Sequence, residues 1–126
     1  MSEGSSTITP AKFHRAPGVT EWRVTPPGPH AVFRASSLAQ AASLVEPVVA
    51  EAERLGIRPD IDVRAEAVIV RIPHCDFEGI PAAAPEFAAV VSRAASSLGL
   101  TADPTLVQTI GIYVAEHSTA DSRPFF

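Results

Sequence analysis

The sequence predicts an α+β domain in which an antiparallel sheet of four or five strands carries two helices packed on one face. Three observations lead to this class: short segments with alternating apolar residues, two longer segments with apolar residues at helical spacing, and the placement of each helix after a pair of strands. Helices placed in this way cover one sheet face, and the other is left for solvent or a partner. Self-association through that second face or through an edge strand would cover it.

Two pairs of short strands are expected. The first pair, 21–25 and 30–35, flanks the sequence PPGP, whose prolines and glycine cannot continue a strand ladder but suit a turn. In the second pair, 61–65 and 68–72, apolar residues recur at every second position, as in strands with one face on a core. Both pairs are therefore predicted to form hairpins.

Each strand pair is followed by a predicted amphipathic helix. The first begins after Ser36 or Ser37 and ends at Gly56, and Pro47 inside it is expected to cause a kink or a restart. Its predicted apolar face comprises Leu38, Ala41, Ala42, Val45, Val49 and Ala52. The second ends at Gly99, and its predicted apolar face comprises Phe87, Val90, Val91, Ala94 and Leu98.

With 126 residues, the chain fits one domain with a single core. Residues 1–18 mix Ser, Thr, Gly and Pro without periodicity and are expected to form a flexible arm. The α+β domain is expected at 19–100, followed by a C-terminal extension at 101–126. Within this extension, the β-branched and alternating segment 105–114 is predicted to form one more strand.

Composition and charge exclude several classes of protein. Hydrophobic residues make up 46% of the chain and charged residues 19%, which is not a disordered composition, and no apolar run approaches the roughly 20 residues of a membrane span. The net charge is −4 and the basic residues are scattered, so nucleic acid is not an expected partner. The start resembles no export signal and Cys75 is the one cysteine, so we expect a cytoplasmic protein without a disulfide.

A succession of motifs resembles a known family. It consists of an early tryptophan, Trp22, a helix ending in AEAERLG, the sequence RPDIDV, the alternating VIVRI, and HCDFEGI before the second helix. From Glu21 to Leu100 this order resembles the pterin-4a-carbinolamine dehydratases. The resemblance implies a pocket for a pterin or another small polycyclic ligand, and a homodimer or homotetramer.

The chain departs from this family at the residues that carry the chemistry. The family's pattern has Glu, three residues and His-His-Pro-Asp, then Thr-His and a Gly-Leu step. The matching positions are Glu53, Pro59, Asp60, Gly79 and Ile80. Where the family has its paired histidines, this chain has Ile57 and Arg58. His74 and Cys75 stand in place of Thr-His, and Ala84 stands in place of an aspartate at the start of the second helix. Isoleucine has no proton to exchange and arginine keeps its proton at neutral pH, so we expect efficient dehydratase turnover to be lost.

Two sets of candidate site residues follow. The candidate catalytic residues are Cys75, His74 and Glu53, and the candidate ligand-binding residues are Arg58, Asp60, Arg71 and Asp76. The thiol of Cys75 is either a nucleophile beside positive charge or a small apolar filler. The guanidinium of Arg58 either contacts the ligand or pairs with Glu53 or Asp60 at the surface.

His74 to Asp76 are consecutive in a predicted extended segment. Such residues cannot all face one ion, so we expect no metal site, and nothing indicates a cofactor. Adjacent strand residues point to opposite faces, so His74 reaches the pocket only if a bulge near Pro73 turns it inward. The side chains expected in the core are Trp22 and Phe33, and those expected at the surface are His14, His30 and His117.

Two functions stay open on this basis. In the first, a divergent dehydratase-like protein without efficient turnover binds a small polycyclic ligand, or performs a redirected lyase-type step in the old pocket. In the second, the same scaffold serves as a non-catalytic dimeric interaction or assembly factor. An enclosed pocket at Arg58 and Cys75 would favour the first function, and a site filled by Ile57 would favour the second.

Overall fold

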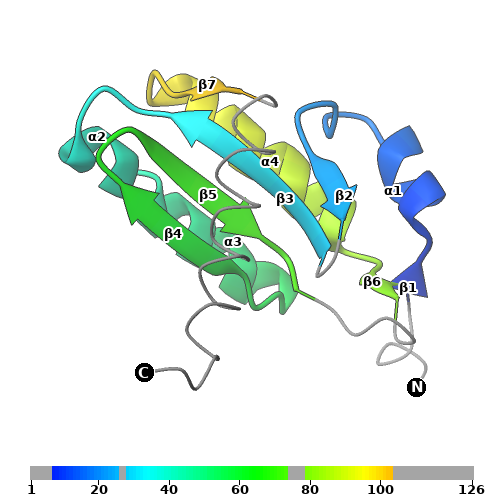
Figure 1. Ribbon diagram of the computed structural model, residues 1–126. Helices are drawn as coiled ribbons and strands as arrows, with labels where there is room; N and C mark the ends of the chain where they lie inside the picture. The colour runs from blue at the N-terminus through cyan, green and yellow to red at the C-terminus, as the bar shows by residue number, and fades with distance from the viewer. Residues whose placement is uncertain (1–6, 26–27, 74–78, 104–126) are drawn as a thin grey trace, which may run out of the picture.

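The computed structural model of the chain describes residues 7–25, 28–73 and 79–103. Its main feature is a five-stranded antiparallel sheet in which the path β2-β3-β5-β4 is extended by β7, which pairs with β3 (Figure 1). The strands are β2 (Arg23–Thr25), β3 (Gly28–Arg34), β4 (Asp60–Arg64), β5 (Ala67–Arg71) and β7 (Thr101–Ala102). A separate two-stranded ladder joins β1 (Thr7–Ile8) to β6 (Ile80–Pro81). The predicted α+β class and both predicted hairpins are confirmed.

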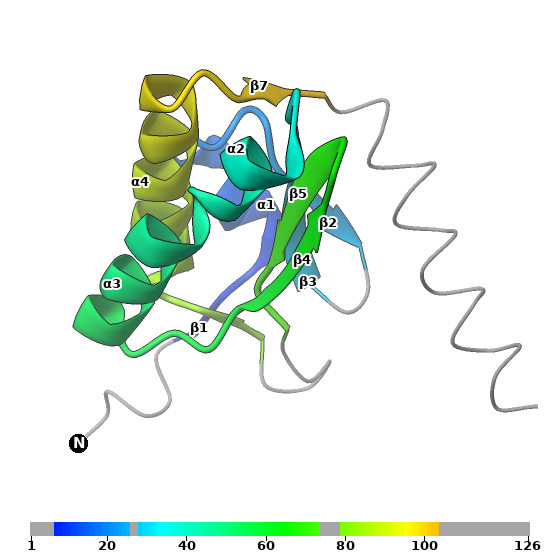
Figure 2. The same cartoon turned by 90° about the vertical axis from the view of Figure 1, so that its left-hand side faces the viewer.

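Three helices lie on one side of this sheet: α2 (Leu38–Ala42), α3 (Val45–Leu55) and α4 (Ala84–Ser97) (Figure 2). Because side chains alternate along a strand, the register assigns each sheet residue to one face. The face toward the helices contributes Ala31, Phe33, Val68 and Val70 to the core, with Ile61 and Val63 packed at its margin. The opposite face, here called the outer face, carries His30, Val32 and Arg34 of β3, Ala67, Ile69 and Arg71 of β5, and Asp60, Asp62 and Arg64 of β4.

The first predicted helix is two helices in the structure. α2 ends at Ala42 and α3 starts again at Val45, so that Pro47 occupies the third position of α3. The first four N–H groups of a helix have no partner within it, and a proline there removes no hydrogen bond. The predicted restart near Pro47 is confirmed.

The buried face of these two helices differs from the predicted one. The buried residues are Ala41, Leu44, Val48 and Ala52, whereas Leu38 and Val49 are 56% and 43% exposed. Two apolar sets at helical spacing overlap in this part of the sequence. Packing against the sheet selects the set that contains Leu44 and Val48, which sequence reasoning had left out.

α4 closes the core on the same side of the sheet. Its buried residues are Ala84, Phe87, Ala88, Val91 and Ala95, so Phe87 and Val91 are confirmed, whereas Leu98 is 36% exposed. Trp22 is fully buried with its ring edge-on to that of Phe87, at 6.5 Å between centroids. Its indole N–H donates to the Ser92 hydroxyl at 2.9 Å, so this large side chain is buried without an unsatisfied donor.

Residues 7–18 differ from the flexible arm that the sequence predicts. They contain β1 and the helix α1 (Pro10–Arg15), which Thr9 caps by accepting a hydrogen bond from the Lys12 amide. Phe13 of α1 is fully buried, which ties this segment to the core. After α1 the chain passes so close to α4 that a Cβ on Gly18, which has φ +83°, would lie 2.8 Å from the Ala89 Cβ.

Because Leu44 is buried and Leu38 is exposed, the same truncation should cost much more stability at the first leucine than at the second. Leu44→Ala removes a fully buried side chain and should lower the free energy of unfolding by about 2–5 kcal/mol. Leu38→Ala truncates an exposed side chain and should change it by less than about 0.5 kcal/mol. Urea unfolding followed by the fluorescence of Trp22 measures both values, and equal losses would contradict this packing.

Candidate functional site

A hollow of about 440 Å³ lies where the end of α3 meets the start of β4. Its lining residues are Val49, Ala52, Glu53, Gly56, Ile57, Arg58, Pro59 and Ile61. This volume is in the range of small-molecule sites, whose walls are mostly apolar with a few polar groups. The hollow thus includes the positions at which the dehydratase resemblance places the paired histidines, here Ile57 and Arg58.

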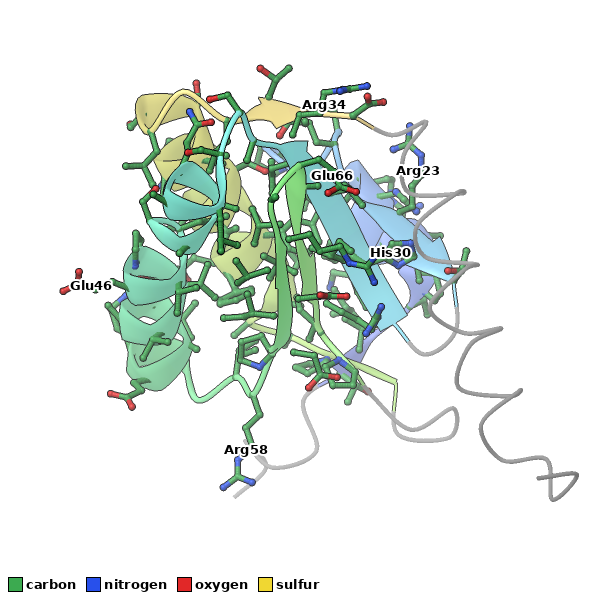
Figure 3. All side chains as sticks on the ribbon, turned by 60° about the vertical axis from the view of Figure 1, so that its left-hand side comes forward. Arg23, His30, Arg34, Glu46, Arg58 and Glu66 are labelled. Atoms are coloured by element: carbon green, nitrogen blue, oxygen red, sulfur yellow. The ribbon has the colours of Figure 1, made fainter. Side chains whose placement is uncertain are left out.

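The turn after α3 decides how these two side chains point. Gly56 ends the helix in the left-handed region at φ +72°, and the Ile57 amide then donates to the Ala52 carbonyl at 2.9 Å. The side chain of Ile57 turns into the core and is 6% exposed. Arg58 is exposed and extends away from the protein below this turn (Figure 3). One side chain therefore closes the floor of the hollow and the next stands at its rim.

Two side chains of opposite charge, Glu53 and Arg58, line the hollow but do not form an ion pair with each other. Within the part of the chain that the structure describes, neither Glu53 nor Arg58 makes an ion pair or a side-chain hydrogen bond. The neighbouring Arg54 behaves differently, because it pairs with Glu51 and reaches Glu86 of α4 at 2.6 Å. Its hydrogen bond to the Glu51 carboxylate lowers the pKa of that group. The predicted surface pairing of Arg58 is thus not seen, and its donors are available to a ligand.

The remaining candidate residues are not brought together with Glu53 and Arg58. Asp60 and Arg71 face each other in register across β4 and β5, but on the outer face, whereas Ile61 beside them faces the core. His74, Cys75 and Asp76 lie outside the described residues. Of the three groups considered for a lyase-type step, Glu53 alone falls in the described part of the chain.

The expectation that His30 lies at the surface is wrong. It is 7% exposed in β3 rather than at the surface, and its Nδ1 lies 3.0 Å from the Gly28 carbonyl oxygen. Burial lowers the pKa of its imidazole, the Gly28 carbonyl partly opposes this shift, and the charges of Arg71 and Arg23 lower the pKa further. His30 lies on the outer face with Arg23 and Arg34, away from the hollow and from Glu46 on α3 (Figure 3).

Three further findings bear on the class of site. Among the described residues there is no cluster of three or more His, Cys, Asp or Glu side chains that could hold a metal ion. No helix in the described ranges combines the length and the apolar character that a membrane span requires. Comparison with protein-family models and with curated proteins found no match for the chain.

The lowered pKa of His30 predicts a loss of stability in acid. A histidine that is harder to protonate when folded favours the unfolded chain once the pH falls below its unfolded value of about 6.5. His30→Gln removes this titration, so the decrease in unfolding free energy from about pH 7.5 to about pH 5.5 should be smaller in the variant than in the parent. His14→Gln, on the exposed surface of α1, serves as the control and should keep the parent's pH dependence.

Proposed function

We propose that this chain binds a small, flat polycyclic ligand, such as a pterin, in the hollow at the end of α3, without efficient dehydratase turnover. The observation that carries the proposal is the hollow of about 440 Å³ itself, which stays open because Ile57 turns into the core beneath it, while Arg58 stands at its rim without an ion pair among the described residues. The proposal rests on the dehydratase resemblance for the kind of ligand and on the geometry of the hollow for the mode of binding.

The walls of the hollow fit a flat heterocycle. Val49, Ala52 and Ile61 offer apolar surface for its faces. The Arg58 guanidinium can donate to a ring oxygen or to an anionic substituent through its planar fork. The Glu53 carboxylate can accept from ring N–H groups, and a charge-assisted hydrogen bond of this kind is roughly twice as strong as a neutral one.

The same residues argue against turnover. Dehydration of a carbinolamine requires one group that protonates the leaving hydroxyl and another that takes a proton from the ring. Ile57 has no such group, and the guanidinium of Arg58 does not release a proton at neutral pH. Among the residues that the structure describes, Glu53 is the one carboxylate that lines the hollow, and a single base does not replace an acid and base pair.

A second function, a dimeric interaction factor, is favoured by a different observation. The large apolar side chains exposed on the described surface are Leu38, Val49 and Leu98, and all three belong to the helical layer. Apolar side chains exposed on the helical layer are available to another protein, and a contiguous patch of such side chains is typical of a protein-binding surface. Sedimentation equilibrium of the full chain tests this function, since a monomer at all concentrations would exclude the homodimer.

The turnover proposal predicts that the purified chain does not accelerate dehydration of freshly generated 4a-hydroxytetrahydropterin. Each missing acid or base group typically contributes about 10²–10⁴-fold, so the observed rate should equal the spontaneous one. Ultraviolet absorbance of the dihydropterin product follows the reaction. Water loss well above the spontaneous rate would overturn this part of the proposal and leave the binding part to be tested separately.

The binding proposal predicts that a tetrahydropterin shifts the backbone amide NMR signals of Ala52, Gly56 and Ile61. Arg58→Ala should weaken this binding by about 10- to 150-fold, because a hydrogen bond to a charged group contributes about 1.5–3 kcal/mol. Arg15→Ala, an exposed arginine on α1, is the control and should bind as the parent does. Shifts confined to other parts of the chain, or an unchanged affinity in Arg58→Ala, would exclude this hollow as the site.

A further inference from the structure

Two open hollows of about 400 Å³ and 510 Å³ adjoin each other between α1 and α4. Ala16 and Pro85 line both of them, so together they form one continuous depression, here called the α1–α4 groove. Lys12 and Arg15 line the first hollow, and Arg93 lines the second. The groove shares no lining residue with the candidate site at the end of α3, and none of the exposed large apolar side chains of the helical layer lines it.

The shape of the groove suits an extended chain. Pro85, Ala89 and Arg93 recur at every fourth residue of α4 and therefore lie on one face of this helix. Eight residues of helix rise by about 12 Å, a length that about four extended residues span. A Cβ on Gly18 would lie 2.8 Å from the Ala89 Cβ, so the backbone after α1 lies against α4 here. Ala16 and Ala89, both half-buried, provide apolar surface between the charged ends.

The charge of the groove is opposite in sign to that of the whole chain, which is −4. Lys12, Arg15 and Arg93 are exposed, and none of them makes an ion pair or a side-chain hydrogen bond with a described residue. Among the described lining residues the one carboxylate is that of Glu86, which already pairs with an arginine of α3 at 2.6 Å. The groove therefore holds three cations without a matching number of acidic groups.

We propose that the α1–α4 groove binds an extended acidic segment of a partner protein. An apolar residue of this segment lies over Ala16 and Ala89, and a carboxylate on either side of it meets the cations. The cations stand at the two ends of the groove, with Lys12 and Arg15 in one hollow and Arg93 in the other. One small anion does not reach both ends, whereas two acidic residues three or four positions apart in an extended chain do.

The size of the groove sets the strength of this interaction. A segment of about four residues buries far less surface than the roughly 800 Å² per partner of a standard protein interface. Exposed ion pairs contribute little each, and salt screens them. We therefore expect weak, rapidly exchanging binding that increased salt weakens further, and NMR titration measures such binding directly.

The test begins with an array of immobilised pentapeptides of the form Glu-X-X-X-Glu, in which X is an apolar residue, probed with the labelled full chain. Matched Gln-X-X-X-Gln peptides are the control and should bind more weakly. The best acidic peptide is then titrated into the full chain, and it should shift the backbone amide signals of Ala16, Gly18 and Ala89. Equal binding of the two arrays, no binding to either, or shifts confined to other residues would overturn the proposal.

Variants of the cations complete the test. Lys12→Glu combined with Arg93→Glu turns two attractions into repulsions and should weaken binding of the acidic peptide at least about tenfold. Lys12→Arg combined with Arg93→Lys keeps both charges and should stay within about threefold of the parent. His14→Glu adds a carboxylate on α1 outside the groove and is expected to have a similarly small effect. An unchanged affinity in the charge-reversed variant would overturn the proposal.

Two further readouts use the parent chain alone, so they decide even if the charge-reversed variant does not fold. Raising the salt concentration from about 50 mM to about 500 mM should weaken peptide binding several-fold, since the contacts are exposed and charged. Affinity that does not depend on salt would overturn the proposal. Amide signals of Ala16 and Ala89 that shift with protein concentration in the absence of peptide would also overturn it, because a second copy of the chain would then occupy the groove.

Discussion

The pairing of β3 with β5 is the constraint on which the other features depend. Its register places Phe33 opposite Val68, with both side chains toward the helices, and Val32 opposite Ile69 on the outer face. A shift by one residue would exchange these sets and move Arg34 into the core. The same register carries Arg71 to the outer face, and this explains why a residue adjacent in sequence to the expected pocket does not contribute to it.

Below the sheet, the turn at Gly56 has a comparable effect on the candidate site. A left-handed residue after a helix reverses the chain within one step, and of the two following residues one enters the core and one leaves it. With Ile57 and Arg58 at these positions, the hollow gains an apolar floor and a cation at its rim. An apolar floor and a cation at the rim suit ligand binding. Proton transfer would require an acid and a base, and neither Ile57 nor Arg58 serves as one at neutral pH.

The strands and the break in the first helix were predictable because they depend on local chemistry, namely alternation and the missing N–H of Pro47. The buried helix face was not, since two overlapping apolar sets fit one helix and only contact with the sheet selects Leu44 over Leu38. His30 was assigned to the surface as a histidine in a loop beside the PPGP turn, whereas β3 starts at Gly28 and places His30 inside the ladder with β2 and β5. Phe13 was missed because a helix of six residues is too short to show periodicity.

The two proposed functions share one part of the surface, because Val49 lines the hollow beside Arg58 and is also an exposed apolar side chain of the helical layer. Val49 belongs to both, so a ligand in the hollow and a protein on the helices would compete for the same side chain, and binding of one should weaken binding of the other.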